Sequence, residues 1–228
     1  MILLSEDLHA FPSALDAPLD QDIIAIGGDL HPRRLLLAYS LGIFPWYNAD
    51  ETPILWQSPH PRFVLFPELL RVNRSLRRAL NKSTLEIRFN TAFEEVLRRC
   101  ADTPRADQEG TWLNPELRAA LCSLHRAGYA HSAEAWRGDQ LVGGLYGLTL
   151  GGVFFGESMF ATEPNASKIT FVKLIESLRE LGYALIDCQA YTDYLASFGA
   201  VEIHRERFLT MLSDLLGTRP TSSWPSSS

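Results

Sequence analysis

Three polar residues at the ends of apolar runs are the positions of this chain best suited to acid–base chemistry. Glu157 follows the glycine-rich apolar run 141–156, and Asp187 and Gln189 stand two positions apart at the end of a later apolar run. Successive side chains of a strand point to opposite faces, so Asp187 and Gln189 are expected side by side on one face. A carboxylate beside an amide is suited to holding an amine and accepting its proton.

Each of these residues also has an ordinary structural explanation. A strand-end aspartate often caps a turn, and on spacing alone that explanation of Asp187 is the better one. A carboxylate at the end of an apolar strand needs a partner, so Glu157 could belong to a buried salt bridge or accept from a helix terminus. The motifs around these positions favour a site over both alternatives.

Eight short motifs follow one another from Gly27 to Gln189 and cover most of the chain: GGDL, GIFPWY, WQSPHPR, GTW, HSAEAW, GESMF, ASK and IDCQ. Together they resemble the leucyl/phenylalanyl-tRNA–protein transferases. The resemblance implies that Leu or Phe, with Met as a further candidate, moves from a charged tRNA to the N-terminal Arg or Lys of a protein, which marks that protein for degradation. It also implies a GNAT-like acyltransferase fold, no metal and no small cofactor.

The resemblance further implies roles for single residues. Asp187 orients Gln189, whose side-chain oxygen contacts the attacking amine, and Glu157 contacts that amine or the cationic acceptor side chain. Asp187 is a second candidate for contact with the cation, and either Asp187 or the substrate takes the proton if Gln189 only positions the amine. The sequence leaves open whether Gln189 itself accepts a proton.

Two groups of residues are expected to bind the donor. Aromatic faces grip single-stranded RNA by stacking on its bases, at roughly 1–3 kcal/mol per base. The resemblance places the terminal adenosine beside Trp46, Trp112 and Tyr39, and the transferred side chain in an apolar pocket of Leu145, Phe171 and Leu174. Core packing is the alternative explanation for all six residues. Trp56, Trp136 and Trp224 are assigned to the core or the tail.

The charge of the chain is distributed unevenly around a net value of −6. Nine Lys or Arg and four Asp or Glu lie in 62–99, a local net charge of +5 that leaves −11 for the rest. Leucine and valine at helical spacing predict a helix over 69–80 that carries an arginine stripe. Phosphate contacts position RNA without reading its sequence, and five residues are expected to make them: Arg71, Arg74, Arg77, Arg78 and Lys82. A solvated helix face is the alternative.

Length and composition indicate a main domain with a small one attached, since 228 residues are 46% hydrophobic. We expect a small N-terminal domain over 1–61, a catalytic domain over 62–216 and a disordered tail over 217–228. Consecutive strands, a helix over 166–181 and a further strand predict an α+β fold with a mixed, mostly antiparallel sheet flanked by helices. Three widely spaced cysteines indicate a reduced cytoplasm, and no apolar run approaches a membrane span of about 20 residues. We expect a monomer.

The sequence departs from the family pattern at two positions. Ala161 follows GESMF where the family has serine, so any substrate contact of that hydroxyl is lost or taken over by Thr162 or Ser158. Leu121 stands where an aromatic residue can occur, which affects one contact to the terminal adenosine.

Two other functions remain as alternatives. An acyl-CoA-dependent N-acyltransferase on the same fold would hold pyrophosphate with a basic residue and closely spaced glycines before a helix, whereas ATEPNASK precedes the helix here. A non-catalytic tRNA-binding module would leave Asp187 and Gln189 without a purpose.

Overall fold

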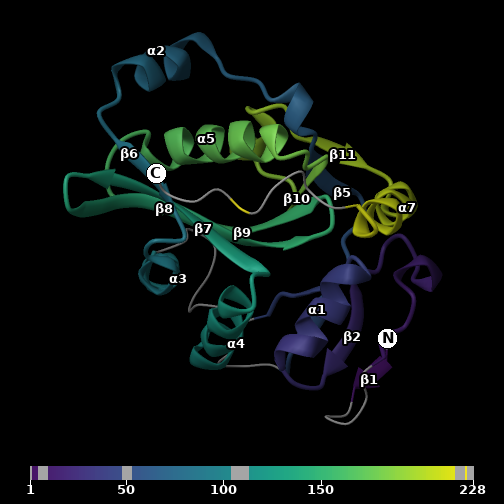
Figure 1. Ribbon diagram of the computed structural model, residues 1–228. Coiled ribbons are helices and arrows are strands. Elements are labelled where there is room, and N and C mark those ends of the chain that lie inside the picture. Colours follow the sequence, from purple (N-terminus) through teal and green to yellow (C-terminus); the bar gives the residue numbers. More distant parts are fainter. Residues whose placement is uncertain (1, 5–9, 48–52, 104–112, 219–223, 225–228) are drawn as a thin grey trace.

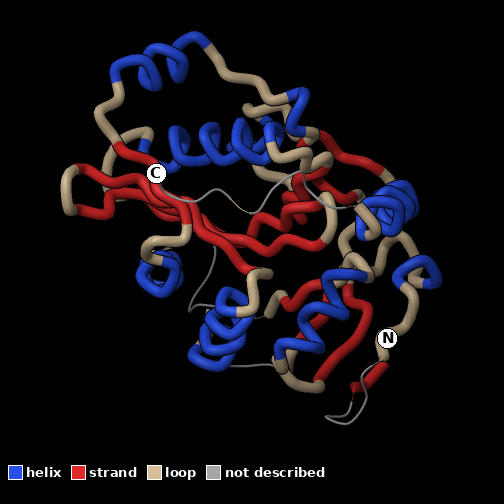
Figure 2. Tube along the Cα trace, viewed as in Figure 1, coloured by secondary structure: helices blue, strands red, loops and turns tan. Residues whose placement is uncertain are grey.

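The computed structural model describes five stretches of the chain: 2–4, 10–47, 53–103, 113–218 and residue 224. Within them the chain forms two sheets, one small and one large, with helices around both (Figure 1). The small sheet lies at the N-terminal side, and the large sheet runs through the middle of the molecule (Figure 2).

The small sheet has four strands in the order β1-β2-β4-β3. These strands are β1 (Ile2–Leu4), β2 (Ile23–Gly27), β3 (Phe44–Pro45) and β4 (Leu55–Gln57). Trp56 is fully buried in this part, and its indole N–H donates to the carbonyl oxygen of Gly27 at 2.9 Å. Trp56 and its buried neighbours share one hydrophobic cluster with residues of the larger part, including Phe155 and Phe208. The tryptophan therefore packs in the core, as predicted.

Helix α1 (Pro32–Ser40) joins β2 to β3, and its start follows from the local sequence. The His31 side chain accepts a hydrogen bond from the Arg33 N–H, and proline occupies the first helical position. The chain leaves the helix through Gly42 at φ +71°, where an added Cβ would come within 2.4 Å of Leu209. Glycine is needed there both for the left-handed backbone and for the close packing.

The large sheet has seven strands in the order β11-β5-β10-β9-β8-β7-β6. Only the β9–β10 pair is parallel, so the predicted mixed, mostly antiparallel sheet is confirmed. The strands are β5 (Arg62–Leu65), β6 (Glu86–Phe89), β7 (Ala130–Arg137), β8 (Gln140–Leu150), β9 (Val153–Ala161), β10 (Leu185–Gln189) and β11 (Val201–Ile203).

Helices pack on both faces of the large sheet (Figure 1). Helix α5 covers one face, and α3 and α4 lie against the other. The helices of this part are α2 (Arg74–Lys82), α3 (Phe93–Asp102), α4 (Pro115–Arg126), α5 (Ala166–Glu180), α6 (Asp193–Ala196) and α7 (Arg205–Leu216). The architecture is α+β, as predicted.

Strands β5 and β11 were not predicted. All four residues of β5 are buried, because the strand lies between β10 and β11 with helices around it. Such a strand shows no alternation of apolar and polar residues, and β11 has only three residues. Of these two unpredicted strands, β5 matters for function because it begins with Arg62.

The helix predicted over 69–80 begins later than expected. A 3-10 turn covers Pro67–Leu69, and α2 starts only at Arg74 because the Asn73 side chain caps it by accepting from the Leu76 N–H at 2.9 Å. Arg71 therefore lies before the helix rather than on it. The remaining four predicted phosphate contacts lie on α2.

The tail predicted to be disordered falls mostly outside the described residues. Trp224 is described, and its ring stacks on the His131 ring at 4.1 Å and on the Phe154 ring at 5.7 Å. Among the described residues, no helix is long and apolar enough to cross a membrane.

Candidate active site

A cavity of about 820 Å³ opens beside the parallel strands β9 and β10. All three predicted catalytic residues, Glu157, Asp187 and Gln189, line it. Its walls also include apolar side chains of β8, β9 and α5 and the loop that follows β10. None of its described lining residues is Lys or Arg, so the cavity is an apolar space with carboxylates and an amide at one side.

Asp187 is fully buried and forms a two-pronged ion pair with Arg62, the first residue of β5. The Arg62 Nε lies 2.8 Å from Asp187 Oδ1, and Arg62 Nη2 lies 2.5 Å from Oδ2. The guanidinium also donates to the Gly42 carbonyl and stands over the rings of Phe44 and Phe208 at 4.9 and 4.4 Å. The segment around β3 and helix α7 therefore both contact Arg62, and Arg62 holds Asp187.

Gln189 does not stand beside the Asp187 side chain as strand alternation predicts. The register between β10 and β5 shifts between these two residues, and Gln189 has φ +65°. Asp187 Oδ1 accepts from the Gln189 backbone N–H at 2.9 Å, and the Gln189 side chain turns to Glu157 instead. A bulge turns a side chain to a new direction in this way. Asp187 therefore fixes the backbone of Gln189 and does not contact its side-chain amide.

Glu157 is the centre of the polar network in the cavity. Its Oε1 accepts from Gln189 Nε2 and from the Tyr39 hydroxyl, both at 2.8 Å, while no described residue donates to its Oε2. Burial disfavours the charged form and raises the pKa of Glu157 to about 7, although the hydrogen bonds from Tyr39 and Gln189 act against this. Glu157 can therefore exchange a proton near neutral pH.

Tyr39 has a different place from the one predicted. Its side chain is 2% exposed, so its ring offers no face to a nucleobase. Burial, followed by the charge of Glu157, raises the pKa of the Tyr39 phenol well above its usual value. The phenol thus stays protonated and donates to Glu157, and this hydrogen bond holds the carboxylate in place.

Trp46 is the exposed aromatic residue predicted for the donor nucleoside. Its side chain is 39% exposed, lines the cavity, and stacks on Phe44 with ring centroids 6.3 Å apart. The Gln57 amide donates to the Trp46 carbonyl oxygen at 2.7 Å and fixes this loop. Trp112, the second predicted tryptophan, lies outside the described residues.

The predicted apolar pocket is formed only in part by the predicted residues. Leu145 and Phe171 line the cavity. Leu174 is fully buried in the core between α5 and the sheet and does not appear among the lining residues, so its assignment to the pocket is corrected to core packing. On the helix α5 it lies three positions after Phe171, close to the same face but deeper in the protein.

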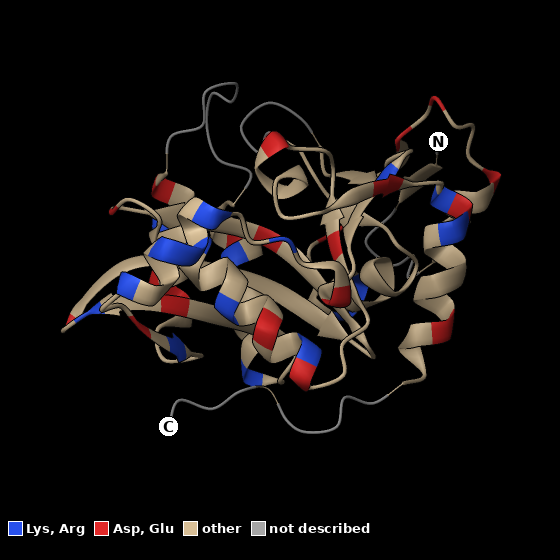
Figure 3. Cartoon of the chain, turned by 90° about the horizontal axis from the view of Figure 1, so that it is seen from above, with Lys and Arg blue, Asp and Glu red and all other residues tan. Residues whose placement is uncertain are grey.

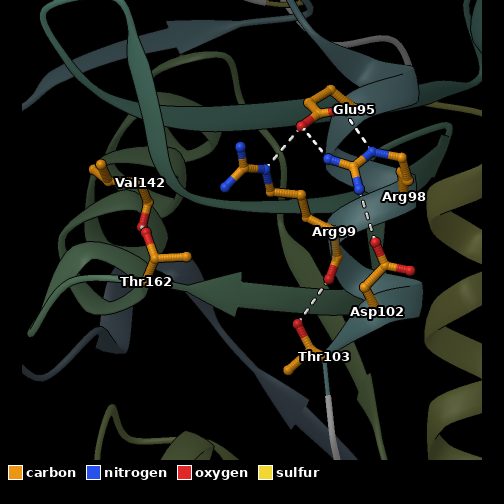
Figure 4. Close-up of polar contacts among 7 residues, drawn as sticks. All are labelled: Glu95, Arg98, Arg99, Asp102, Thr103, Val142 and Thr162. Atoms are coloured by element: carbon orange, nitrogen blue, oxygen red, sulfur yellow. Dashed lines mark hydrogen bonds and ion pairs between the residues drawn. The ribbon is translucent and has the colours of Figure 1, made fainter.

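The basic excess in 62–99 has two components. Most arginines outside α2 are paired: Arg62 with Asp187, Arg88 with Glu86, and Arg98 and Arg99 with Glu95. Figure 4 shows the α3 network, in which Arg98 also contacts Asp102 at 2.8 Å.

The exposed basic residues of and before α2 make up the other component. They have no ion-pair partner among the described residues: Arg71, Arg74, Arg77, Arg78 and Lys82. Figure 3 shows the charged positions from the side on which α2 lies. Within the described residues of 62–99, these five are therefore the cations still available to an anionic partner.

The two departures from the family pattern, Ala161 and Leu121, lie in different places: one at the cavity and one in the core. Ala161 and Ser158 line the cavity, whereas the Thr162 hydroxyl donates to the Val142 carbonyl at 3.2 Å (Figure 4). Of the two residues that could replace the missing hydroxyl, Ser158 is therefore the one in place. Leu121 is 2% exposed and belongs to the core.

One residue of the site was not singled out from the sequence, namely Arg62. It stands at the end of the motif WQSPHPR, and its partner Asp187 is 125 positions away. The signal was a lone arginine at the start of an apolar stretch, which needs a buried partner.

Fold and site together define an α+β protein with a carboxylate–amide network at the wall of an apolar cavity. The chain matches the leucyl/phenylalanyl-tRNA protein transferase family over residues 64–213 and the N-terminal domain of that family over residues 28–60. The chain belongs to this family.

Curated relatives agree with this assignment. A leucyl/phenylalanyl-tRNA–protein transferase of Anaeromyxobacter sp. (strain Fw109-5) is 55% identical over 87% of this chain and 84% of its own length. The corresponding protein of Myxococcus xanthus (strain DK1622) is 52% identical over 93% and 91%. A solved structure of L-PGS from Bacillus licheniformis is similar with a TM-score of 0.46 and 11% identity, covering 86% of this chain and 73% of that one, which is too distant to support an argument.

Proposed function

We infer that this chain is an aminoacyltransferase that moves Leu or Phe from aminoacyl-tRNA to the N-terminal Arg or Lys of an acceptor protein. Family membership over most of the chain supports the reaction. The observation that carries the assignment of the site is the pair of hydrogen bonds to one oxygen of Glu157, which leaves its other oxygen without a donor among the described residues.

We propose that the donor binds with its nucleoside at Trp46 and its side chain in the apolar part of the cavity. Stacking on an exposed indole suits a terminal base, at roughly 1–3 kcal/mol. Leu145 and Phe171 offer an apolar wall that accepts Leu, Phe or Met and disfavours polar side chains. The ester carbonyl would then lie between these two ends, near Glu157 and Gln189.

In the proposed reaction, the neutral α-amine of the acceptor attacks the ester carbonyl carbon. A carbon–nitrogen bond forms and the carbon–oxygen bond to the ribose breaks. The proton lost by the amine passes to Glu157 Oε2 and from there to the leaving ribose oxygen, so no net charge is created. A carboxyl group with a pKa of about 7 is well matched to an α-amine, whose usual pKa is roughly 7.7–8.0.

The other polar residues have supporting roles in this proposal. Gln189 holds Glu157 through its amide nitrogen, which leaves its carbonyl oxygen to position the amine. Asp187 has one oxygen bound to Arg62 and the other shared between Arg62 and the Gln189 N–H, and so it orients Gln189. Positioning two reactants in this way can lower the barrier by about 7–11 kcal/mol.

The fold type, the domain bounds, the oligomeric state and the location of the protein belong to the same proposal. We propose a GNAT-like fold for 62–216, a separate N-terminal domain over 1–61, a monomeric state and a cytoplasmic location, where charged tRNA is found. The five free basic residues around α2 would bind acceptor-stem phosphates. The proteins that receive the amino acid are then N-degron substrates.

An acyl-CoA-dependent N-acyltransferase is the second candidate. The absence of Lys and Arg from the described cavity lining weighs against it, since a pyrophosphate needs cations or a glycine-rich turn. Transfer of labelled leucine from charged tRNA to peptides that differ only in their first residue tests the choice. Transfer to Arg- and Lys-initiated peptides that RNase abolishes is expected; labelling from acyl-CoA instead would overturn the proposal.

A further inference from the structure

The acceptor of the proposed reaction brings a second positive charge that the network around Glu157 does not accommodate. Asp187 is already neutralised by Arg62, and Glu157 is assigned to the α-amine. An N-terminal Arg or Lys carries its side-chain cation several bonds away from that amine. A separate group must therefore meet the guanidinium or ammonium if the enzyme selects for it.

Tyr191 is an aromatic residue at the edge of the cavity that the proposed mechanism does not use. It follows Gln189 by two positions, lines the cavity, and is 54% exposed. Its ring packs against the Phe63 ring of β5 at a tilt of 56°, with centroids 5.1 Å apart, so the protein supports it on that side. An exposed ring held in this way offers a surface to a cation.

Two acidic residues interact electrostatically with Tyr191. The Tyr191 hydroxyl donates to Asp193 Oδ1 at 2.7 Å, and the pairing of β11 with β5 places Glu202 opposite Phe63. The hydrogen bond to Asp193 and the charge of that carboxylate raise the pKa of Tyr191, and burial and the charge of Glu202 add to the effect. A phenol that donates to a carboxylate has a more electron-rich ring, which strengthens its attraction for a cation.

The surroundings of Tyr191 favour a cation over a nucleobase. The described cavity lining contains no Lys or Arg that would hold a neighbouring phosphate, and Asp193 and Glu202 are both exposed acids. A polynucleotide carries a phosphate with every base, so a second stacking site beside two carboxylates would repel it. A cationic peptide side chain meets attraction from both groups.

We propose that Tyr191, together with Asp193 and Glu202, forms the subsite for the cationic side chain of the acceptor's first residue. This inference rests on the proposed function and adds the residues that select its acceptor. The chemical class of the ligand is a guanidinium or ammonium group on a flexible side chain. Tyr191 meets its face, and the two carboxylates supply the opposite charge.

Two peptides that begin with Arg or with citrulline test the proposal, because citrulline has nearly the same shape and no charge. The readout is the ratio of kcat/KM for the two peptides at saturating Phe-tRNA. Tyr191→Ala and the double variant Asp193→Asn/Glu202→Gln are each expected to lower this ratio about three- to fivefold. Tyr191→Phe, which keeps the ring and loses its bond to Asp193, should lower it less.

Matched controls come from outside the cavity. Tyr129→Ala removes another exposed tyrosine, and Asp139→Asn removes an exposed acid at the far hairpin of β7 and β8. Neither should change the ratio. The same unfolding midpoint in all variants, followed by circular dichroism, shows that the fold is intact.

Three results would overturn the inference. An unchanged ratio with normal transfer would show that Tyr191 and the acids do not meet the cation. A raised KM for Phe-tRNA with an unchanged ratio would instead assign Tyr191 to the RNA. Wild-type protein that transfers to neither peptide would contradict the function itself, and the subsite with it.

Discussion

The carboxylate of Asp187 and the guanidinium of Arg62 are both almost completely buried and face each other through two hydrogen bonds. Two charges removed from water remain stable together only while the pair is complete, since either one alone pays the full desolvation cost. The pair also reaches the site, because the same Asp187 oxygen that meets Arg62 Nε accepts from the Gln189 N–H. Stability and the shape of the site therefore depend on one interaction.

Removal of one partner should be more harmful than removal of both. Arg62→Ala or Asp187→Ala is expected to lower the free energy of unfolding by about 3–5 kcal/mol, because a buried charge stays behind. The double variant Arg62→Met/Asp187→Leu should recover most of that loss. Urea unfolding of the three variants measures this, and equal losses for single and double variants would contradict it.

Transfer activity separates the two roles of the pair. Asp187→Ala is expected to reduce turnover by orders of magnitude while binding of charged tRNA persists, and the apolar double variant should remain poorly active although it folds. The reason is that both variants remove the Asp187 carboxylate, which accepts the hydrogen bond from the Gln189 backbone N–H. Near-normal turnover in the double variant would remove Asp187 from the mechanism.

Local features of the fold could be predicted from the sequence, and non-local ones could not. The starts of α1 and α4 follow from Pro32 and from Asn114, whose side chain accepts from the Leu117 N–H three positions on. The Arg62–Asp187 and Tyr39–Glu157 contacts join residues 125 and 118 positions apart. No periodicity reports such contacts, and short buried strands such as β5 give no pattern either.

The sequence predicted which residues line the cavity better than it predicted how their side chains are arranged. Glu157, Asp187, Gln189 and Trp46 all line the cavity. Strand alternation placed the Asp187 and Gln189 side chains together, and the bulge with φ +65° at Gln189 separates them. A bulge depends on the partner strand, so a single sequence could not reveal it.

The left-handed backbone of Gln189 allows its side chain to be tested without disturbing the chain. Glycine adopts this conformation readily, so Gln189→Gly should keep the fold and lose the contact to Glu157. We expect kcat to fall about 10²- to 10³-fold, the size of the loss when a positioned polar group is removed from an active site. Rapid-quench measurement of transfer from Phe-tRNA gives this number.

A matched control is available at Asn165, which also has φ +65° but lies outside the cavity. Asn165→Gly should leave kcat unchanged. If Gln189→Gly retains full turnover, the amide has no part in the reaction.

The pH dependence of transfer should reflect Glu157. Burial raises its pKa to about 7, and only the ionised carboxylate can accept a proton, so kcat is expected to fall as the pH drops through about 7. Glu157→Gln should lower kcat strongly and remove this limb. The remaining dependence would then follow the acceptor amine, with its pKa of roughly 7.7–8.0. A wild-type profile without a limb near 7 would argue against Glu157 as the base.

The same group should make stability depend on pH in the opposite direction. A carboxyl whose pKa is raised from 4.5 to about 7 binds its proton more tightly in the folded state. Its stabilising contribution is complete below about pH 4.5 and is lost as the pH rises through about 7. Relative to Glu157→Gln, the wild type should lose on the order of 1–2 kcal/mol across this range, allowing for partial exposure. Urea unfolding at pH 5 and pH 8 measures the difference.

The basic residues on α2 should govern the salt dependence of donor binding. Arg74 and Arg78 are exposed and have no ion-pair partner among the described residues, so each can release counterions from a phosphate. Replacing both with Gln is expected to weaken Phe-tRNA binding and to reduce the slope of log K against log salt by about 2. Filter binding between 50 and 200 mM salt, a range over which phosphate contacts weaken markedly, measures the slope.

Arg98→Gln is the control, because Arg98 is already bound to Glu95 and Asp102 on α3. A slope that is unchanged in the double variant, or reduced equally in the control, would show that α2 is a solvated face and that the RNA lies elsewhere.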